Sequence, residues 1–230
     1  MQASELFNQP NTILLDGGMG TMLQAAGMKL GTRPEDLNLE NPELIRSIHA
    51  KYAAAGSRVV NANTFGASPH KLADSKYTLE EVITEGIANC KQAVAPYGAL
   101  VTLDVGPLGE LLEPSGTLAF EDAVAEYGRI VRAGVAAGAD ILYFETFTDL
   151  YEMKAALLAA KENSTLPIMA SMSFEANGRT FTGCTVESFA ATARGLGANA
   201  VGINCSLGPK EIFPMAKRLA EAVPGDFPVF

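Results

Sequence analysis

Short apolar runs alternate with longer segments of helical period along this 230-residue chain, and no other feature limits its fold as strongly. The runs are rich in Val, Ile, Leu or Phe and mostly lack strict polar alternation, as in parallel strands buried on both faces. They predict seven strands, at residues 12–16, 58–63, 99–105, 140–145, 167–173, 199–204 and 227–230. Repeated strand–helix units of this kind predict a parallel sheet with right-handed crossovers.

The helices between these strands have recognisable starts. Asn41 precedes a proline, which suits the first helical position, and Thr78 with Glu81 forms a capping-box pattern. Asp149 with Glu152 repeats that pattern, and Pro209 is expected to open the last helix.

Polar or ionisable residues follow six of the predicted strands. In an open doubly wound sheet, ligand-binding residues gather at one switch point. In a closed barrel, the site is built from all the strand-to-helix loops. Polar ends on six strands therefore favour a (βα)8 TIM barrel, with the open sheet as the alternative. The residues are Asp16, Asn61, Asn63, Thr64, Asp104, Glu145, Thr146, Ser171, Ser173, Asn204, Cys205 and Ser206.

Composition excludes several classes of function. The chain has 17 basic and 26 acidic residues and no basic cluster, so we expect no nucleic-acid interface. No apolar stretch is long enough for a membrane span, and no secretory signal pattern opens the chain. Three cysteines do not suggest a disulfide framework and fit a reducing compartment, so a cytoplasmic location is predicted.

The stretch DGGMGT at residues 16–21 raises the question of a phosphate-binding loop. It lacks the third glycine of a dinucleotide fingerprint and the Gly-Lys-Ser/Thr of a P-loop, and its acid would repel phosphate. Glycines at 17 and 18 instead allow close backbone approach to a small ligand. An amino acid would suit the stretch, with its ammonium on Asp16 and its carboxylate on the following helix start.

The three cysteines differ in their surroundings. Cys90 falls on the apolar stripe of a helix and is expected in the core, while the role of Cys184 stays open. Cys205 ends a predicted strand just before a helix, where a thiol is suited to act as a nucleophile or a metal ligand.

Six motifs taken together resemble the homocysteine S-methyltransferase family, and most of all its cobalamin-dependent methionine synthase branch. The resemblance covers the whole chain in order. The motifs are DGGMGT (16–21), NANTFGAS (61–68), DVGPLGE (104–110), ETFTDLYEMKAA (145–156), GRTFTG (178–183) and GINCSLGP (202–209).

This resemblance implies a (βα)8 barrel that binds homocysteine and a zinc ion at its carboxyl-terminal mouth. Cys205 would be the catalytic zinc ligand, and the substrate amino group would meet acids such as Glu145. The substrate carboxylate would meet the backbone near Gly18 and Met19. Zinc coordination keeps the substrate sulfur deprotonated and leaves an open position for it. Further pocket residues implied by the motifs are Asp16, Thr64, Asp104 and Asn204.

In its relatives the methyl group comes from methylcobalamin on a separate domain, and folate remethylates the cobalt. The partners implied are therefore homocysteine and the cobalamin and folate domains of a longer polypeptide.

The sequence departs from the family at its end. It stops within the predicted seventh strand, and the adjacent cysteine pair that supplies the other two zinc ligands does not occur. We therefore expect residues 1–230 to be a barrel domain lacking its C-terminal part, inactive alone and able to self-associate through open sheet edges. The alternative is a non-catalytic truncated barrel that binds a small amino acid or acts as an interaction module.

Overall fold

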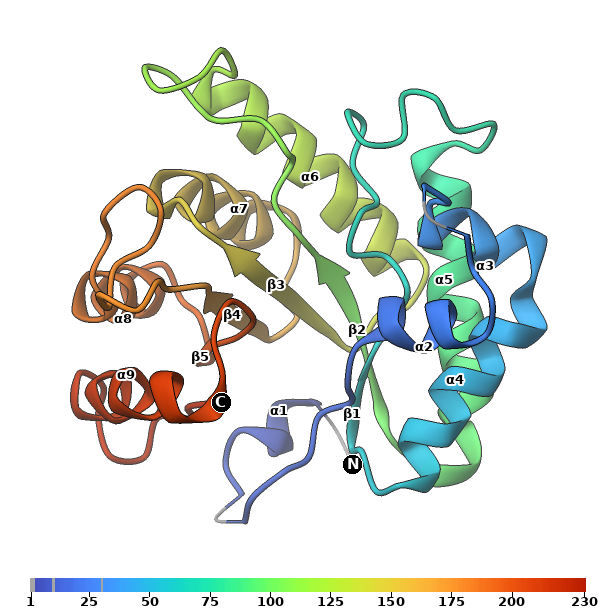
Figure 1. The fold of residues 1–230 in the computed structure, drawn as a ribbon, viewed down its shortest axis with the longest axis horizontal. Helices are drawn as coiled ribbons and strands as arrows, with labels where there is room; N and C mark the ends of the chain where they lie inside the picture. The colour runs from blue at the N-terminus through green and yellow to red at the C-terminus, as the bar shows by residue number, and fades with distance from the viewer. Residues whose placement is uncertain (1–2, 10, 30) are drawn as a thin grey trace.

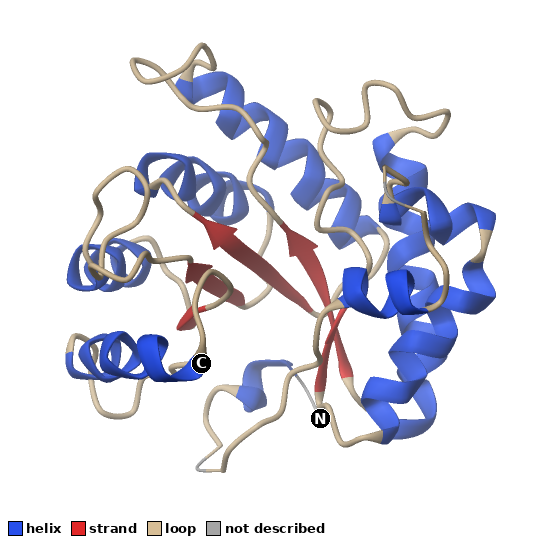
Figure 2. Ribbon diagram, in the orientation of Figure 1, coloured by secondary structure: helices blue, strands red, loops and turns tan. Residues whose placement is uncertain are grey.

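A parallel sheet of five strands forms the centre of the computed structural model, which describes residues 3–9, 11–29 and 31–230 (Figure 2). The strands lie side by side in chain order, so the sheet has no switch point, which excludes the open doubly wound alternative. The described residues form a half-barrel of the TIM type. The prediction was a (βα)8 barrel truncated in its seventh strand, and the described residues do not show the full count of eight strand–helix units. The strands are β1 (Val59–Asn61), β2 (Leu100–Val105), β3 (Ile141–Phe147), β4 (Ile168–Met172) and β5 (Ala200–Ile203).

Helices form a layer around the outer face of this sheet (Figure 1). The longer ones are α4 (Pro42–Ala54), α5 (Leu79–Val94), α6 (Phe120–Ala136), α7 (Leu150–Asn163), α8 (Val186–Gly195) and α9 (Pro209–Glu221). The short ones are α1 (Ala3–Leu6), α2 (Met19–Ala25), α3 (Leu37–Glu40) and the 3-10 turns Pro34–Asp36 and Ala95–Tyr97. Within the described part of the chain, no helix combines the length and apolar character needed to cross a membrane.

The predicted helix starts are largely confirmed. The Asn41 side chain accepts a hydrogen bond from the Leu44 N–H, and Thr78 and Glu81 form the reciprocal capping box. Asp149 caps α7 by accepting from the Tyr151 N–H.

The predicted capping box at Asp149 is wrong in its second half. Glu152 does not reach back to the cap. Its buried carboxylate accepts hydrogen bonds from the Leu108 N–H at 2.7 Å and the Tyr127 hydroxyl at 2.8 Å. Because these two partners would otherwise be buried without a bond, Glu152 fastens the loop after β2 and helix α6 onto α7.

The first and seventh predicted strands flank the sheet but are not full strands. Leu15 makes a single parallel bridge to Val59, and Val229 makes one to Val201. Each segment has a sheet neighbour on one side only and pairs with it through a single bridge. Seven chain segments nevertheless follow the barrel wall in the predicted order.

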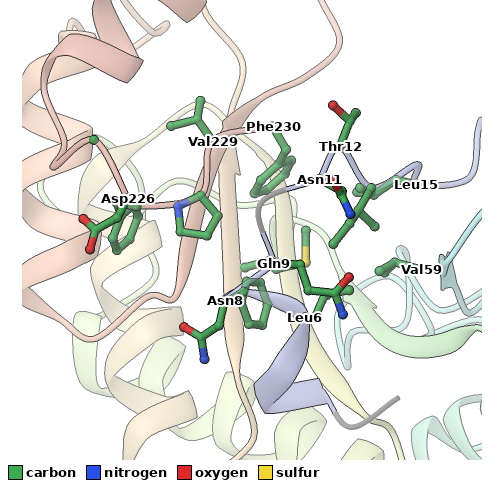
Figure 3. A pocket seen from close by; sticks show the side chains of 16 residues that line it. Leu6, Asn8, Gln9, Asn11, Thr12, Leu15, Val59, Asp226, Val229 and Phe230 are labelled. Carbon is green, nitrogen blue, oxygen red and sulfur yellow. The ribbon is translucent and has the colours of Figure 1, made fainter.

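A cavity of about 770 Å³ lies between these two edge segments (Figure 3). Residues 11–13 and Leu15 line it on one side, and residues 225–230 line it on the other. No backbone bridge joins residues 12–16 to residues 227–230 in the described chain. We call this opening the seam.

The two faces of the sheet have separate cores. The outer face packs against the helices, with Phe144 and Phe147 among its fully buried side chains. The inner face holds a smaller cluster that includes Val59, Tyr143 and Met169, and Leu6 of α1 packs into it. The inner cluster fills the lower part of the half-barrel, so the polar side chains are left at its upper, carboxyl end.

Candidate functional site

A cavity of about 420 Å³ opens at the carboxyl ends of the strands. It brings together seven of the eight side chains and backbone positions expected to form a site. It contains no lysine, arginine or histidine in its lining. The lining residues are Leu15, Asp16, Gly17, Gly18, Met19, Asn61, Ala62, Asn63, Phe65, Asp104, Tyr143, Glu145, Asn204, Cys205 and Phe230.

The loop at residues 16–18, which lines this cavity, packs closely against Tyr52. A Cβ atom on Gly17 would lie 2.9 Å from the Tyr52 hydroxyl oxygen, so a side chain at position 17 would clash. The Tyr52 hydroxyl donates a hydrogen bond to the Gly18 carbonyl at 3.2 Å. Asp16 is fixed by the Asn61 N–H, which donates to its Oδ2 at 3.0 Å.

A β-bulge in β3 places Glu145 in the lining of the cavity and Thr146 beside Asn204 and Cys205. The register between β3 and β4 shifts between Phe144 and Phe147, both of which pack in the outer core. The two intervening residues, Glu145 and Thr146, are turned toward the carboxyl end of the sheet, as bulges near active sites often do. Thr146 has a φ of 64°, which is rare for a β-branched residue.

Three carboxyl groups share the cavity without a basic partner in its lining. Burial, followed by the nearby Glu145 charge, raises the pKa of Asp16 to about 7. Burial, then the charges of Glu145 and Asp16, raises the pKa of Asp104 well above its ordinary value, and burial also raises the pKa of Glu145. Among the described residues, Oδ1 of Asp16 and Oδ1 of Asp104 are buried with no hydrogen-bond partner. Such oxygens favour a cationic ligand.

Thr64 lies behind the cavity wall rather than in its lining, contrary to the expectation that it contacts the ligand. It is buried, and its Oγ1 donates to the Asp104 carbonyl at 2.8 Å and accepts from the Asp104 N–H at 3.1 Å. Thr64 therefore fastens the loop after β1 to strand β2 and supports Asp104.

Cys205 is the exposed member of the three cysteines, and it faces the cavity beside Asn204 and Thr146. Its Sγ lies 3.5 Å from Asn204 Nδ2 and 3.6 Å from Thr146 Oγ1. Cys90 is buried in the core as predicted. Cys184 lines a different cavity, and burial raises its pKa to about 11, so its thiol stays protonated.

The described residues do not fit a complete zinc site. Zinc is held by three or four nitrogen, sulfur or carboxylate ligands. Within the described ranges, no group of three or more His, Cys, Asp or Glu residues has an arrangement that could hold a metal ion. Cys205 is a single suitable thiol.

Three aromatic lining residues were not predicted from the sequence. Tyr143 stands two residues before Glu145, so the two-residue period of a strand could have placed it on the same face. Phe230 packs over Gly202, where a Cβ atom would lie 2.5 Å from its ring, and its ring centroid is 5.5 Å from that of Tyr143. Neither Phe230 nor Phe65 carries a local signal that predicts this position.

A site at the carboxyl ends of parallel strands, built from the loops that follow them, is typical of TIM-barrel enzymes. The homocysteine S-methyltransferase family matches this chain over residues 13–229, and the chain belongs to this family.

Relatives in this family differ in length. Methionine synthase of Mycobacterium tuberculosis (strain ATCC 25618 / H37Rv) is 28% identical over 223 residues, which is 89% of this chain and 19% of that protein. Methionine synthase of Mycobacterium leprae (strain TN) is 28% identical over 225 residues, which is 90% of this chain and 18% of that protein. The chain thus spans about a fifth of the length of these curated relatives.

A solved structure shows the same fold. The homocysteine methyltransferase MmuM from Escherichia coli, in a metallated form, superposes with a TM-score of 0.87 at 24% identity. The match covers 98% of this chain and 84% of MmuM.

Proposed function

We propose that this chain binds homocysteine as the methyl acceptor in the reaction that forms methionine. The observation that carries the proposal is the pair of unpartnered, buried oxygens on Asp16 and Asp104 in a cavity that Cys205 also lines. An α-amino acid with a sulfur end matches this arrangement. Membership of the homocysteine S-methyltransferase family supports it.

The substrate ammonium would lie among the three carboxylates. An ammonium gives the unpartnered oxygens of Asp16 and Asp104 charge-assisted hydrogen bonds, and its charge offsets the repulsion between these groups and Glu145. The substrate carboxylate would bind the backbone N–H groups of Gly18 and Met19. These groups stand at the start of α2, where N–H groups have no partner within the helix.

The substrate sulfur would lie toward Cys205 and Asn204. In the methyl transfer the homocysteine thiol first gives its proton to solvent water, because the thiolate is the nucleophile. The sulfur then forms a bond to the methyl carbon, and the bond between that carbon and its carrier breaks with the electron pair leaving on the carrier. The aromatic rings of Phe65 and Phe230 would limit water at this point.

The proposal extends to zinc, the donor and the cell compartment. Cys205 would contribute one zinc ligand, and the other ligands would come from outside the described residues. Residues 1–230 alone would therefore not catalyse the methyl transfer. The methyl group would come from methylcobalamin, recharged by methyltetrahydrofolate, on further domains of a longer cytoplasmic polypeptide. The methionine synthases that this chain resembles are about five times its length, which supports such domains.

Calorimetry with three ligands tests the proposal. We expect homocysteine to bind more tightly than 4-mercaptobutyrate, which lacks the amino group, and than 2-aminobutyrate, which lacks the thiol. Asp16→Asn should weaken homocysteine binding by about tenfold, as expected for loss of a charge-assisted hydrogen bond. Glu110→Gln, outside the cavity lining, is the matched control and should leave the affinity unchanged. Equal binding of homocysteine and 4-mercaptobutyrate would refute the role given to the carboxylates.

A further inference from the structure

The side-chain amide of Asn204 is held in one orientation by its neighbours. Its Oδ1 accepts hydrogen bonds from the Thr146 N–H at 3.1 Å and from the Ser171 hydroxyl at 2.9 Å. Its Nδ2 donates to Thr146 Oγ1 at 2.7 Å, to Glu145 Oε2 at 3.2 Å and to Cys205 Sγ at 3.5 Å. A backbone N–H can only donate, so the oxygen of the amide must face Thr146 and Ser171.

Ser171 continues this chain of hydrogen bonds into the strand layer. It is fully buried in β4, and its one hydroxyl proton is given to Asn204 Oδ1. The Tyr143 hydroxyl lies 3.0 Å from Ser171 Oγ, and it also hydrogen-bonds the Glu145 carboxylate. Ser171 therefore links Tyr143 to the side-chain amide of Asn204.

Reversing the side-chain amide of Asn204 would break its hydrogen bonds. If the amide turned over, Asn204 Oδ1 would face the Glu145 carboxylate, and Nδ2 would face the Thr146 N–H. Both new contacts would join like partners, acceptor with acceptor and donor with donor, and each would lose a buried hydrogen bond. Ser171 opposes this rotation although it is not among the residues that line the cavity.

We propose that Ser171 is a positioning residue that, through Asn204, keeps the Nδ2 group turned toward the cavity, where its two N–H bonds are shared among Thr146 Oγ1, the Glu145 carboxylate and the Cys205 sulfur. In the proposed function, Glu145 lies at the ammonium end of the ligand and Cys205 at its sulfur end. The role of Ser171 in ligand binding therefore rests on the proposed function. Tyr143 supports the same orientation through its contact with the Ser171 hydroxyl. Ser171 thus fixes the relation between the two ends of the site without touching the ligand.

Side-chain amide NMR on the full chain, without any ligand, tests the role of Ser171. In Ser171→Ala, we expect the two Nδ2 protons of Asn204 to exchange with water roughly tenfold faster, with a shifted ¹⁵N resonance, because one buried hydrogen bond is lost. Tyr143→Phe should shift the same signals in the same direction by less. Backbone signals outside the site report whether each variant is folded.

Thr102→Val is the matched control. Thr102 is also a fully buried strand hydroxyl, and it donates to the side-chain oxygen of another asparagine, Asn61, at 2.8 Å. This variant should leave the Asn204 signals unchanged. Unchanged Asn204 signals in a folded Ser171→Ala would overturn the proposal. If Ser171→Ala does not fold, unchanged signals in Tyr143→Phe would overturn it. Because homocysteine is absent, these results do not depend on whether homocysteine is the ligand.

Discussion

Thr146 Oγ1 and Cys205 Sγ lie 3.6 Å apart across the mouth of the candidate site, and both residues have left-handed backbone conformations, with φ of 64° and 58°. A left-handed conformation costs a residue with a side chain about 1–2 kcal/mol. The two strained residues, one in the bulge of β3 and the other just after β5, are 59 positions apart in the chain, yet they meet at one point. Strain of this kind gathers at functional sites, where the surrounding structure holds it in place.

The strain at Thr146 can be measured with two variants that both lose its hydroxyl. Thr146→Gly should be more stable than Thr146→Ala by about 1 kcal/mol, because glycine adopts positive φ without a steric penalty. Urea unfolding at pH 7 gives both free energies of unfolding. A Thr146→Ala variant as stable as Thr146→Gly would show that the left-handed conformation is not strained.

Asp16 should limit the stability of the chain at neutral and alkaline pH. Its pKa is about 7 in the folded chain, against an ordinary value of 3.8 for an unfolded chain, so the folded state favours the protonated form. The stabilisation is complete below about pH 3.8 and is lost as the pH rises to 7. Asp16→Asn removes this loss, and we expect it to raise the free energy of unfolding at pH 8 by about 2–4 kcal/mol.

The same Asp16→Asn variant should bind homocysteine more weakly, so stability and binding would change in opposite directions. Urea unfolding at pH 5 and pH 8 gives the stability change, and its absence at pH 8 would contradict the buried, unpartnered state of this carboxyl group.

His49 should make the chain sensitive to acid. It is fully buried in α4, neither ring nitrogen has a partner among the described residues, and burial lowers its pKa to about 4. Because the unfolded state binds a proton near pH 6.5, stability is lost as the pH falls from 6.5 to 4, by about 3 kcal/mol in total. His49→Leu should remove this part of the pH dependence in thermal melts. His70→Leu, at an exposed histidine, is the control and should leave it in place.

The seam should promote self-association. Residues 12–16 and 227–230 each pair with the sheet on one side only, and unpaired strand edges are templates for another chain. We expect light scattering to detect dimers or larger species that grow with concentration. Val229→Pro removes a backbone donor at this edge, so it should reduce them. A wild-type chain that stays monomeric at high concentration would contradict this prediction.

Much of the fold followed from hydrophobic pattern and chemistry at the ends of helices. Apolar runs between capped helices predicted the order of the strands, and polar ends on six strands correctly favoured a barrel-type sheet. The pattern could not show that residues 12–16 and residues 227–230 each pair with the sheet through a single bridge. Pairing at a sheet edge depends on the neighbouring strand, which the local sequence does not encode.

Side chains at or near the ends of strands could be placed in the cavity lining from the sequence, and other residues less so. Asp16, Asp104, Glu145, Asn204 and Cys205 do line one cavity. Thr64 does not line the cavity because its hydroxyl binds the backbone of Asp104, which lies 40 residues further along the chain. Glu152 matched a local capping pattern but found partners on other elements. Competition between local and distant hydrogen bonds decides such cases.

A crystal structure of the chain with homocysteine bound is the most direct test of the central claim. We predict the ligand nitrogen within about 3 Å of Asp16 Oδ1 and Asp104 Oδ1, the normal length of such hydrogen bonds, and the ligand sulfur on the Cys205 side of the cavity. Homocysteine bound with its nitrogen away from both carboxylates, or bound outside this cavity, would contradict the account.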